Sequence, residues 1–218
     1  MAKDAETPEH LPRFISLEGG EGCGKSTQAR LLAARLEEMG ADVILTREPG
    51  GTPSAEAIRG LLVSGDTDRW RPMTEALLHT AARVEHVERV IRPALARGAW
   101  VISDRFLDST RAYQGLTQGL GLGPVDRLQE LAIGDFRPAL TLLLDMAPER
   151  AAERLSGRDG REDRYERMGA AFHARLRDAF LQLAHQEPDR IHVIDCDHGM
   201  DEVAARIWHA VRERFKLP

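Results

Sequence analysis

Five short apolar runs alternate with longer stretches whose apolar residues recur at helical spacing, and this alternation constrains the fold more than any other feature. The runs cover residues 14–17, 43–45, 100–102, 140–144 and 191–194. Short apolar runs of this kind are typical of buried strands, and strands that alternate with helices favour a parallel sheet. The pattern therefore predicts an α/β fold built on a parallel sheet.

The stretches between the runs carry apolar stripes with the period of a helix, which we interpret as core faces. Three stripes stand out: Leu32, Leu36 and Met39; Leu77, Ala81, Val84, Val87 and Ile91; and Val203, Ile207, Val211 and Phe215. The second stripe could serve the core or an interface with another chain. Glycines that follow helical stretches are expected to end helices in the left-handed conformation, here at Gly40, Gly98 and Gly134.

Composition and charge limit the functional classes. The 218 residues are 42% hydrophobic and 30% charged, which suits one globular domain and argues against wholesale disorder. The net charge of -5 removes the general attraction to nucleic acid or acidic membranes that a basic domain shows. The chain contains no apolar run near the ~18 residues of a membrane span. We expect a disordered tail over 1–12, a single domain over 13–218, and neither nucleic acid nor membrane as partner.

The cysteines and the start of the chain point to a compartment. Cys23 and Cys196 are too few for a disulfide framework and match no metal-ligand spacing. The first ten residues, MAKDAETPEH, lack the apolar core of a secretion signal. The expected location is therefore the reducing cytosol.

Residues 19–26 read GGEGCGKS and fit the pattern G-x-x-x-x-G-K-[ST] between a strand over 13–18 and an apolar-periodic helix. Glycines let successive backbone N–H groups form an anion-binding nest, to which a lysine adds charge and a serine hydroxyl adds an Mg²⁺ ligand. The pattern predicts a phosphate-binding loop made of Gly19, Gly20, Glu21, Gly22, Cys23, Gly24, Lys25, Ser26 and Thr27. Only three of the 30 basic residues are lysines, and the other two, Lys3 and Lys216, lie near the termini.

A phosphate-binding loop of this kind works with a second carboxylate at the end of another strand. Asp104 and Asp145 are the candidates, and Asp104 is preferred because Arg105 beside it supplies a phosphate-binding fork. The alternative for Asp104 is a helix cap. The chain contains no asparagine, which argues against a GTPase switch with its Asn-Lys-x-Asp signature.

The segment 154–167 reads RLSGRDGREDRYER and breaks the α/β pattern with dense charge and two glycines. A solvated charged loop is the simpler interpretation of such a run. The alternative is a short lid that brings arginines to a phosphate.

Three motifs together resemble those of bacterial thymidylate kinases. They are Glu18 with the phosphate-binding loop, residues 46–52 (TREPGGT) and residues 104–115 (DRFLDSTRAYQG), in the order and at the spacing of that family. The resemblance extends from about Phe14 to the last helix. It implies a three-layer fold of the P-loop NTPase type with a five-stranded parallel sheet, flanking helices and an arginine-bearing lid. It also implies transfer of a phosphoryl group from ATP to dTMP with Mg²⁺, and a homodimer.

The resemblance also implies roles for single residues. Lys25, Ser26 and the loop amides would hold the ATP phosphates, Ser26 and Asp104 would hold Mg²⁺, and Glu21 would face the 3′-hydroxyl of dTMP. Further substrate-binding residues would be Glu48 and Pro49 along the acceptor site, Arg59 and Arg105 on its phosphate, and Arg83, Thr110 and Gln114 at the thymine edge. Because Gly22 stands where some members have an arginine, the lid residues Arg158 and Arg161 would supply the positive charge for catalysis.

The sequence departs from the family pattern at three positions. His79 stands where a phenylalanine would stack on thymine, Phe106 replaces a tyrosine, and Ala139 replaces an aspartate. If His79 stacks on the base, its ordinary pKa near ~6.5 predicts dTMP affinity that varies between about pH 6 and 8.

Two other functions compete with a thymidylate kinase. One is another nucleoside or nucleotide kinase on the same fold, against which Arg83, Thr110 and Gln114 argue. The other is a nucleotide-binding module without catalysis, which would not need Lys25, Arg105 and lid arginines together.

Overall fold

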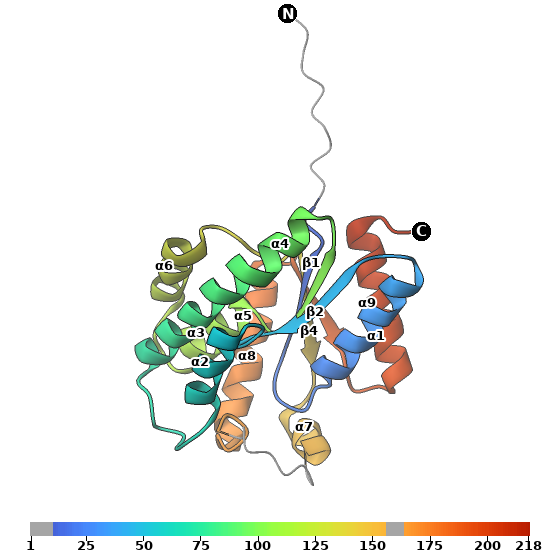
Figure 1. Ribbon diagram of the computed structural model, residues 1–218. Coiled ribbons are helices and arrows are strands. Elements are labelled where there is room, and N and C mark those ends of the chain that lie inside the picture. The colour runs from blue at the N-terminus through green and yellow to red at the C-terminus, as the bar shows by residue number, and fades with distance from the viewer. Residues whose placement is uncertain (1–10, 156–163) are drawn as a thin grey trace, which may run out of the picture.

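The computed structural model describes residues 11–155 and 164–218. A five-stranded sheet runs through its centre with helices on both faces (Figure 1). All strands are parallel and follow the order β2-β3-β1-β4-β5. The five strands are β1 Phe14–Glu18, β2 Val43–Arg47, β3 Trp100–Asp104, β4 Leu140–Asp145 and β5 Ile191–Asp195. The α/β prediction and all five strand positions are confirmed.

Eleven helical elements connect and cover the strands in the described part of the chain. They are α1 Lys25–Glu38, α2 Pro53–Val63, α3 Pro72–His86, the π-helix η1 Val87–Ile91, α4 Arg92–Ala96, α5 Leu107–Thr110, the π-helix η2 Arg111–Thr117, α6 Leu122–Ile133, α7 Pro148–Leu155, α8 Ala170–Gln186 and α9 Met200–Phe215. Helices α1 and α9 pack on one face of the sheet, whereas α4 and α8 contact the strands from the other (Figure 1).

The core follows from strands that are apolar on both faces. In β1, Ile15 and Leu17 join the cluster under α1 and α9, while Phe14 joins the cluster on the opposite face. Parallel strands covered on both sides read as continuous apolar runs for this reason. Polar side chains in the sheet are paired, as in the hydrogen bond of 3.0 Å between the Ser16 and Thr141 hydroxyls.

The first and third stripes lie in the core apart from Met39, which is 47% exposed. The second stripe divides, because Val87 and Ile91 are fully buried in the core whereas its first two residues face outward. Leu77 is 50% exposed, and Ala81 is also exposed. The buried face of α3 instead carries Ala76, Thr80 and Arg83 at helical spacing, because this face turns toward polar groups in the interior. All three predicted helix stops have positive φ, of 82° at Gly40, 84° at Gly98 and 73° at Gly134, but the ψ of -150° at Gly134 differs from the left-handed helical conformation.

Two expectations fall partly outside the described residues. The tail over 1–12 is described only at its last two positions, and the lid over 154–167 only at 154–155 and 164–167. In the described residues, no helix is both long enough and apolar enough to cross a membrane.

Candidate active site

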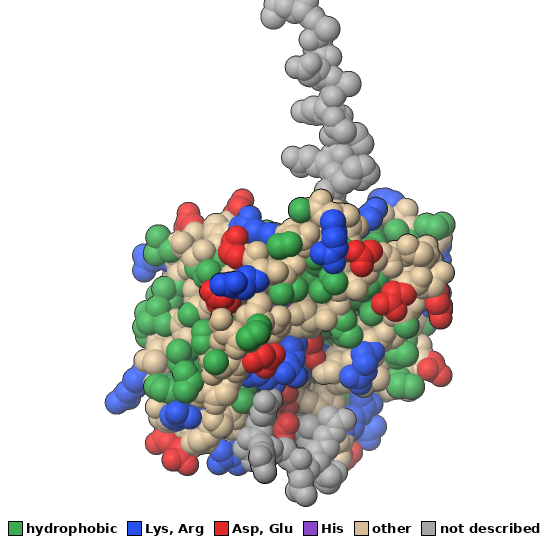
Figure 2. Space-filling model, in the orientation of Figure 1, with side chains coloured by type: hydrophobic (Ala, Val, Ile, Leu, Met, Phe, Trp, Pro, Cys, Tyr) green, Lys and Arg blue, Asp and Glu red, His purple; other side chains and the backbone are tan. Residues whose placement is uncertain are grey.

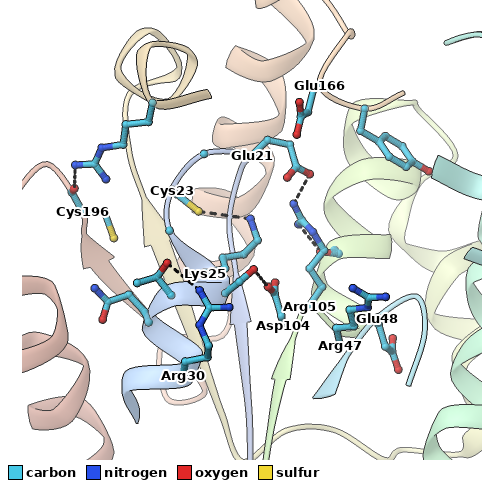
Figure 3. Close-up of a pocket in the computed structure, with 18 of the residues that line it drawn as sticks. Glu21, Cys23, Lys25, Arg30, Arg47, Glu48, Asp104, Arg105, Glu166 and Cys196 are labelled. Atoms are coloured by element: carbon cyan, nitrogen blue, oxygen red, sulfur yellow. Dashed lines mark hydrogen bonds and ion pairs between the residues drawn. The ribbon is translucent and has the colours of Figure 1, made fainter. Parts of the chain in front are cut away.

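A cavity of about 980 Å³ opens at the carboxyl ends of the strands, next to the centre of the sheet. This is where open parallel α/β sheets place their ligands, because the connections on the two sides of the sheet diverge there. Its walls come from the loop after β1, from the end of β3, from helices α2 and α3, from η2, and from the segment after β5. Figure 3 shows Glu21, Lys25, Asp104 and Arg105 gathered around this space.

The loop over 19–24 has the backbone that its glycines predict. Gly24 adopts φ of 93° and precedes α1, which begins at Lys25. Gly19 adopts φ of 133°, and a Cβ there would lie 2.4 Å from the Leu144 carbonyl oxygen, so only glycine fits. The Lys25 ammonium is buried and donates to the Gly20 carbonyl at 2.6 Å. The loop thus brings Lys25 next to the N-terminus of α1, which is the arrangement that the predicted phosphate-binding loop requires.

Ser26 and Asp104 meet across the cavity. The Ser26 hydroxyl donates to Asp104 Oδ2 at 2.5 Å. Asp145, the other candidate carboxylate, is held by Arg177 through hydrogen bonds of 2.7 and 2.8 Å. Asp104, and not Asp145, thus lies beside Ser26, and a hydroxyl next to a carboxylate is a hard oxygen donor set of the kind that Mg²⁺ prefers. The described residues contain no cluster of three or more His, Cys, Asp or Glu side chains able to hold a metal ion.

Arg105 occupies the left-handed region with φ of 70°, which is uncommon for a residue other than glycine and typical of functional turns. Its guanidinium donates to Glu21 Oε1 at 2.6 Å, to the Gly19 carbonyl at 3.0 Å and to the Tyr113 hydroxyl at 3.1 Å. Burial opposes ionisation of Glu21, but the charges of Arg105 and Lys25 outweigh it and lower the pKa of Glu21 to about 2. A carboxylate inside a phosphate-binding loop is thus held by neighbouring donors.

Glu18, the last residue of β1, fixes the turn that carries Arg105. Its buried carboxyl accepts from the Phe106 amide at 2.7 Å and from the Ser109 hydroxyl at 2.5 Å. Burial, together with the nearby charge of Asp108, raises the pKa of Glu18 to about 8. The group is therefore largely protonated at neutral pH.

The side of the cavity formed by α2 and α3 rests on a buried ion pair. Arg83 Nε donates to Glu48 Oε2 at 2.8 Å, and Arg83 Nη2 donates to the Thr110 hydroxyl at 3.0 Å. The ring of His86 bonds the other Glu48 oxygen at 2.9 Å. Glu48, Pro49 and Arg59 line the cavity, and Arg59 donates to the Pro49 carbonyl at 3.0 Å. Arg83 and Thr110 lie buried behind this wall.

His79 lines the cavity beside Tyr165, with 3.3 Å between its Nε2 and the tyrosine hydroxyl. Burial and the positive charges of Arg83 and Arg105 lower the pKa of His79 to about 3. The ring is neutral throughout the neutral range, so the expected change of its charge between about pH 6 and 8 is wrong. Burial makes the larger contribution to this shift, and the arginines add to it.

The other predicted residues are Gln114, Phe106 and the two lid arginines. Gln114 lines the cavity from η2. Phe106 is buried against Phe14, with ring centroids 4.9 Å apart and nearly perpendicular planes. Arg158 and Arg161 lie outside the described residues, so their roles stay predictions.

The structure adds residues that the sequence did not single out as functional. Tyr113 and Tyr165 line the cavity near His79 and Arg105, while Gln28, Arg30 and residues 196, 198–200 and 203 line it on the side of the N-terminus of α1 and the segment after β5. The segment after β5 could have been found, since the carboxyl ends of parallel strands meet at one edge of the sheet. No sequence feature marked Tyr165 as functional, because tertiary packing brings this side chain to the cavity.

Comparison with known proteins agrees with this geometry. A profile of the thymidylate kinase family matches residues 17–207. The chain belongs to the thymidylate kinase family. It is 55% identical to a thymidylate kinase of Caulobacter vibrioides over 204 residues, covering 94% of this chain and 98% of that protein. It is also 55% identical to one of Dinoroseobacter shibae over 195 residues, covering 89% and 94%.

A solved structure supports the assignment. The crystal structure of thymidylate kinase from Ehrlichia chaffeensis matches with a TM-score of 0.75 and 34% identity, covering 91% of this chain and 97% of the other. Membership in the family thus rests on the fold as well as on the sequence.

Proposed function

We propose that the chain transfers the γ-phosphoryl group of ATP to dTMP, giving dTDP and ADP. The observation that carries the proposal is one continuous cavity in which the phosphate-binding loop, with Lys25, faces a second set of groups that includes Arg105, His79 and Gln114. A loop for the donor phosphates and a separate wall for an acceptor are what phosphoryl transfer between two nucleotides requires.

The donor half is built around the loop amides and Lys25. The ammonium already points at loop carbonyls, so it is positioned to exchange these contacts for phosphate oxygens. Beyond the loop, Gln28, Arg30 and Met200 extend the cavity and leave room for the ribose and base of ATP.

Ser26 and Asp104 are the residues proposed to hold Mg²⁺. When bound, the ion would neutralise charge on the β- and γ-phosphates. Their adjacency, with hydroxyl and carboxylate oxygens in contact, supports this assignment.

The acceptor half is proposed to bind dTMP. Arg105 and Arg59 carry the charge for its phosphate. Gln114 would read the thymine edge, whereas Arg83 and Thr110 are buried and do not line the cavity. Glu21 lies next to Arg105 and is ionised, so it can accept a hydrogen bond from the sugar 3′-hydroxyl.

Catalysis is proposed to proceed by direct in-line transfer without a covalent enzyme intermediate. Lys25 and Arg105 would stabilise charge on the migrating group, and Arg158 and Arg161 of the lid would add to it. The lid over 154–167 and the single domain over 13–218 remain proposals.

The decisive experiment is a coupled assay of ADP release with dTMP, dUMP, dCMP, dGMP and AMP as acceptors. A preference for dTMP supports the proposal. Preference for another acceptor would point to a different nucleotide kinase, and ATP binding without any turnover would point to a non-catalytic module.

The proposed assembly is a homodimer. Large apolar side chains stay exposed on three neighbouring helices: Leu61 on α2, Met73 and Leu77 on α3, and Leu131 on α6. Figure 2 shows apolar side chains over the region that these helices occupy in Figure 1. Contiguous exposed apolar surface of this kind marks interaction sites.

Light scattering tests the dimer, with Leu131→Glu expected to give monomers and Met39→Glu, at the exposed residue that follows α1, as the control. A wild-type monomer at assay concentration would contradict the proposal. The cytosol is the proposed location, supported by the two cysteines, which are free and buried.

A further inference from the structure

Glu75 is a buried carboxylate in the first turn of α3, and four side chains donate to it. Its Oε2 accepts from Gln114 Nε2 at 2.9 Å, from Gln118 Nε2 at 2.9 Å and from the Tyr165 hydroxyl at 3.3 Å. Its Oε1 accepts from Arg164, with both residues of this pair fully buried. Glu75 thus connects α3, η2 and residues 164–165 at one point.

The carboxylate decides how the amide of Gln114 is oriented. A carboxylate accepts hydrogen bonds and donates none, so Gln114 must turn its NH₂ group toward Glu75. The carbonyl Oε1 of Gln114 is then the polar atom left for a ligand. It is buried and has no hydrogen-bond partner among the residues that the structure describes, while the side chain lines the cavity. A buried acceptor without a donor is costly in the free protein.

We propose that Glu75 is a positioning residue that sets the base specificity of the pocket, by fixing the Gln114 amide so that its carbonyl oxygen, and not its NH₂ group, is the end that meets the base. This inference rests on the proposed function. Thymine and uracil carry a hydrogen-bond donor at N3, which matches that oxygen. Cytosine has an acceptor at N3, which would leave two acceptors facing each other.

Arg164 makes the effect of a substitution predictable. A guanidinium only donates, so residue 75 must offer an oxygen to Arg164 in any variant that keeps the arginine. In Glu75→Gln, the new NH₂ group therefore takes the place of Oε2 and faces Gln114. Gln114 must then rotate its amide and present NH₂ to the base, which favours an N3 acceptor over an N3 donor.

The experiment measures kcat/KM for dTMP, dUMP and dCMP with the wild type, with Glu75→Gln and with Arg164→Met. In Glu75→Gln the ratio of kcat/KM for dTMP to kcat/KM for dCMP should fall by about 10- to 100-fold, the range for a lost or reversed buried hydrogen bond. The ratio of dUMP to dTMP should not change, because these bases share the same edge. Arg164→Met removes an ion pair but keeps the carboxylate that orients Gln114. Any loss of kcat/KM in this variant should therefore be the same for all three nucleotides.

A general loss of structure would lower the three rates in parallel and leave both ratios constant. Constant ratios in Glu75→Gln would therefore overturn the inference while leaving the kinase assignment intact. A wild type that phosphorylates none of the three nucleotides would overturn the proposed function and this inference with it.

If Glu75→Gln does not fold, NMR of the otherwise unmodified protein decides, with Gln114→Leu used only to assign the Gln114 signals. The Nε2 protons of Gln114 should exchange with water more slowly than those of the exposed Gln186, and dTMP should shift the Gln114 side-chain carbonyl resonance. Exchange as fast as at Gln186, or a carbonyl signal indifferent to dTMP, would overturn the inference.

Discussion

Replacement of Glu18 by glutamine should change how stability depends on pH. Its carboxyl is fully buried, and burial together with the charge of Asp108 raises its pKa to about 8, from the ordinary value of 4.5 that holds in an unfolded chain. Between these two values the folded protein keeps a proton that the unfolded chain releases. The free energy of unfolding contributed by Glu18 therefore falls as the pH rises through this window.

The size of the effect follows from the two pKa values. A single proton difference lowers the free energy of unfolding by about 1.4 kcal/mol per pH unit, and the loss between about pH 6 and pH 8 integrates to about 2 kcal/mol. Glu18→Gln has no proton to lose. The stability of the variant relative to the wild type should therefore rise by about 2 kcal/mol over this range, since all other groups titrate in both proteins.

Urea unfolding of both proteins at the two pH values measures this change. For a domain of this size it corresponds to a relative shift in Tm of about 4 to 8 °C. Glu37→Gln, on the exposed face of α1, controls for the amide itself. Stability curves of wild type and Glu18→Gln that stay parallel within about 0.5 kcal/mol would show that Glu18 is ionised in the folded protein, and the reasoning would be wrong.

Three further predictions concern the cavity. Lys25→Met should lower kcat by well over tenfold with an unchanged circular dichroism spectrum. Lys25→Arg should restore little activity, because a planar guanidinium replaces a compact ammonium charge. A Lys25→Met variant that keeps a tenth of the wild-type kcat contradicts the loop assignment. Asp104→Asn should raise the Mg²⁺ concentration for half-maximal activity by about tenfold, and an unchanged Mg²⁺ titration would exclude Asp104 as a ligand. His79→Ala should raise KM for dTMP, because it removes ~1 to 3 kcal/mol of stacking free energy, whereas His79→Phe should leave KM for dTMP unchanged or lower. Because the pKa of His79 is about 3, both the wild type and His79→Phe should show the same pH profile of dTMP affinity between about pH 6 and 8, and a titration specific to the wild type would contradict this.

The strands and the phosphate-binding loop were predictable because their signals are local. An apolar run such as residues 140–144 has apolar side chains on both faces of the strand, so the sequence alone indicates a strand that is covered on both sides. The glycine pattern before Lys25 likewise fixes a backbone shape without help from distant residues. The orientation of α3 was not predictable, because its buried face carries Glu75 and Arg83, and polar residues face inward only when partners from elsewhere receive them.

The electrostatics of the site depended on tertiary structure in the same way. The pKa of His79 responds to arginines at positions 59, 83, 105 and 164, which lie on separate elements of the chain. No pattern in the sequence brings them together. Residues that the resemblance suggested, such as Lys25 and Gln114, line the cavity, but nothing in the sequence indicated that the buried Glu75 contacts Gln114.

Arg164 has a further consequence for the motions of the chain. Besides Glu75, its guanidinium donates to the carbonyls of Leu62, Asp66 and Thr67, and its own amide donates to Val63. One side chain thus holds the connection between α2 and α3 to a segment about a hundred residues later. In hydrogen exchange the two segments should behave as one cooperative unit, with the amides of Arg164 and Arg69 opening at the same free energy.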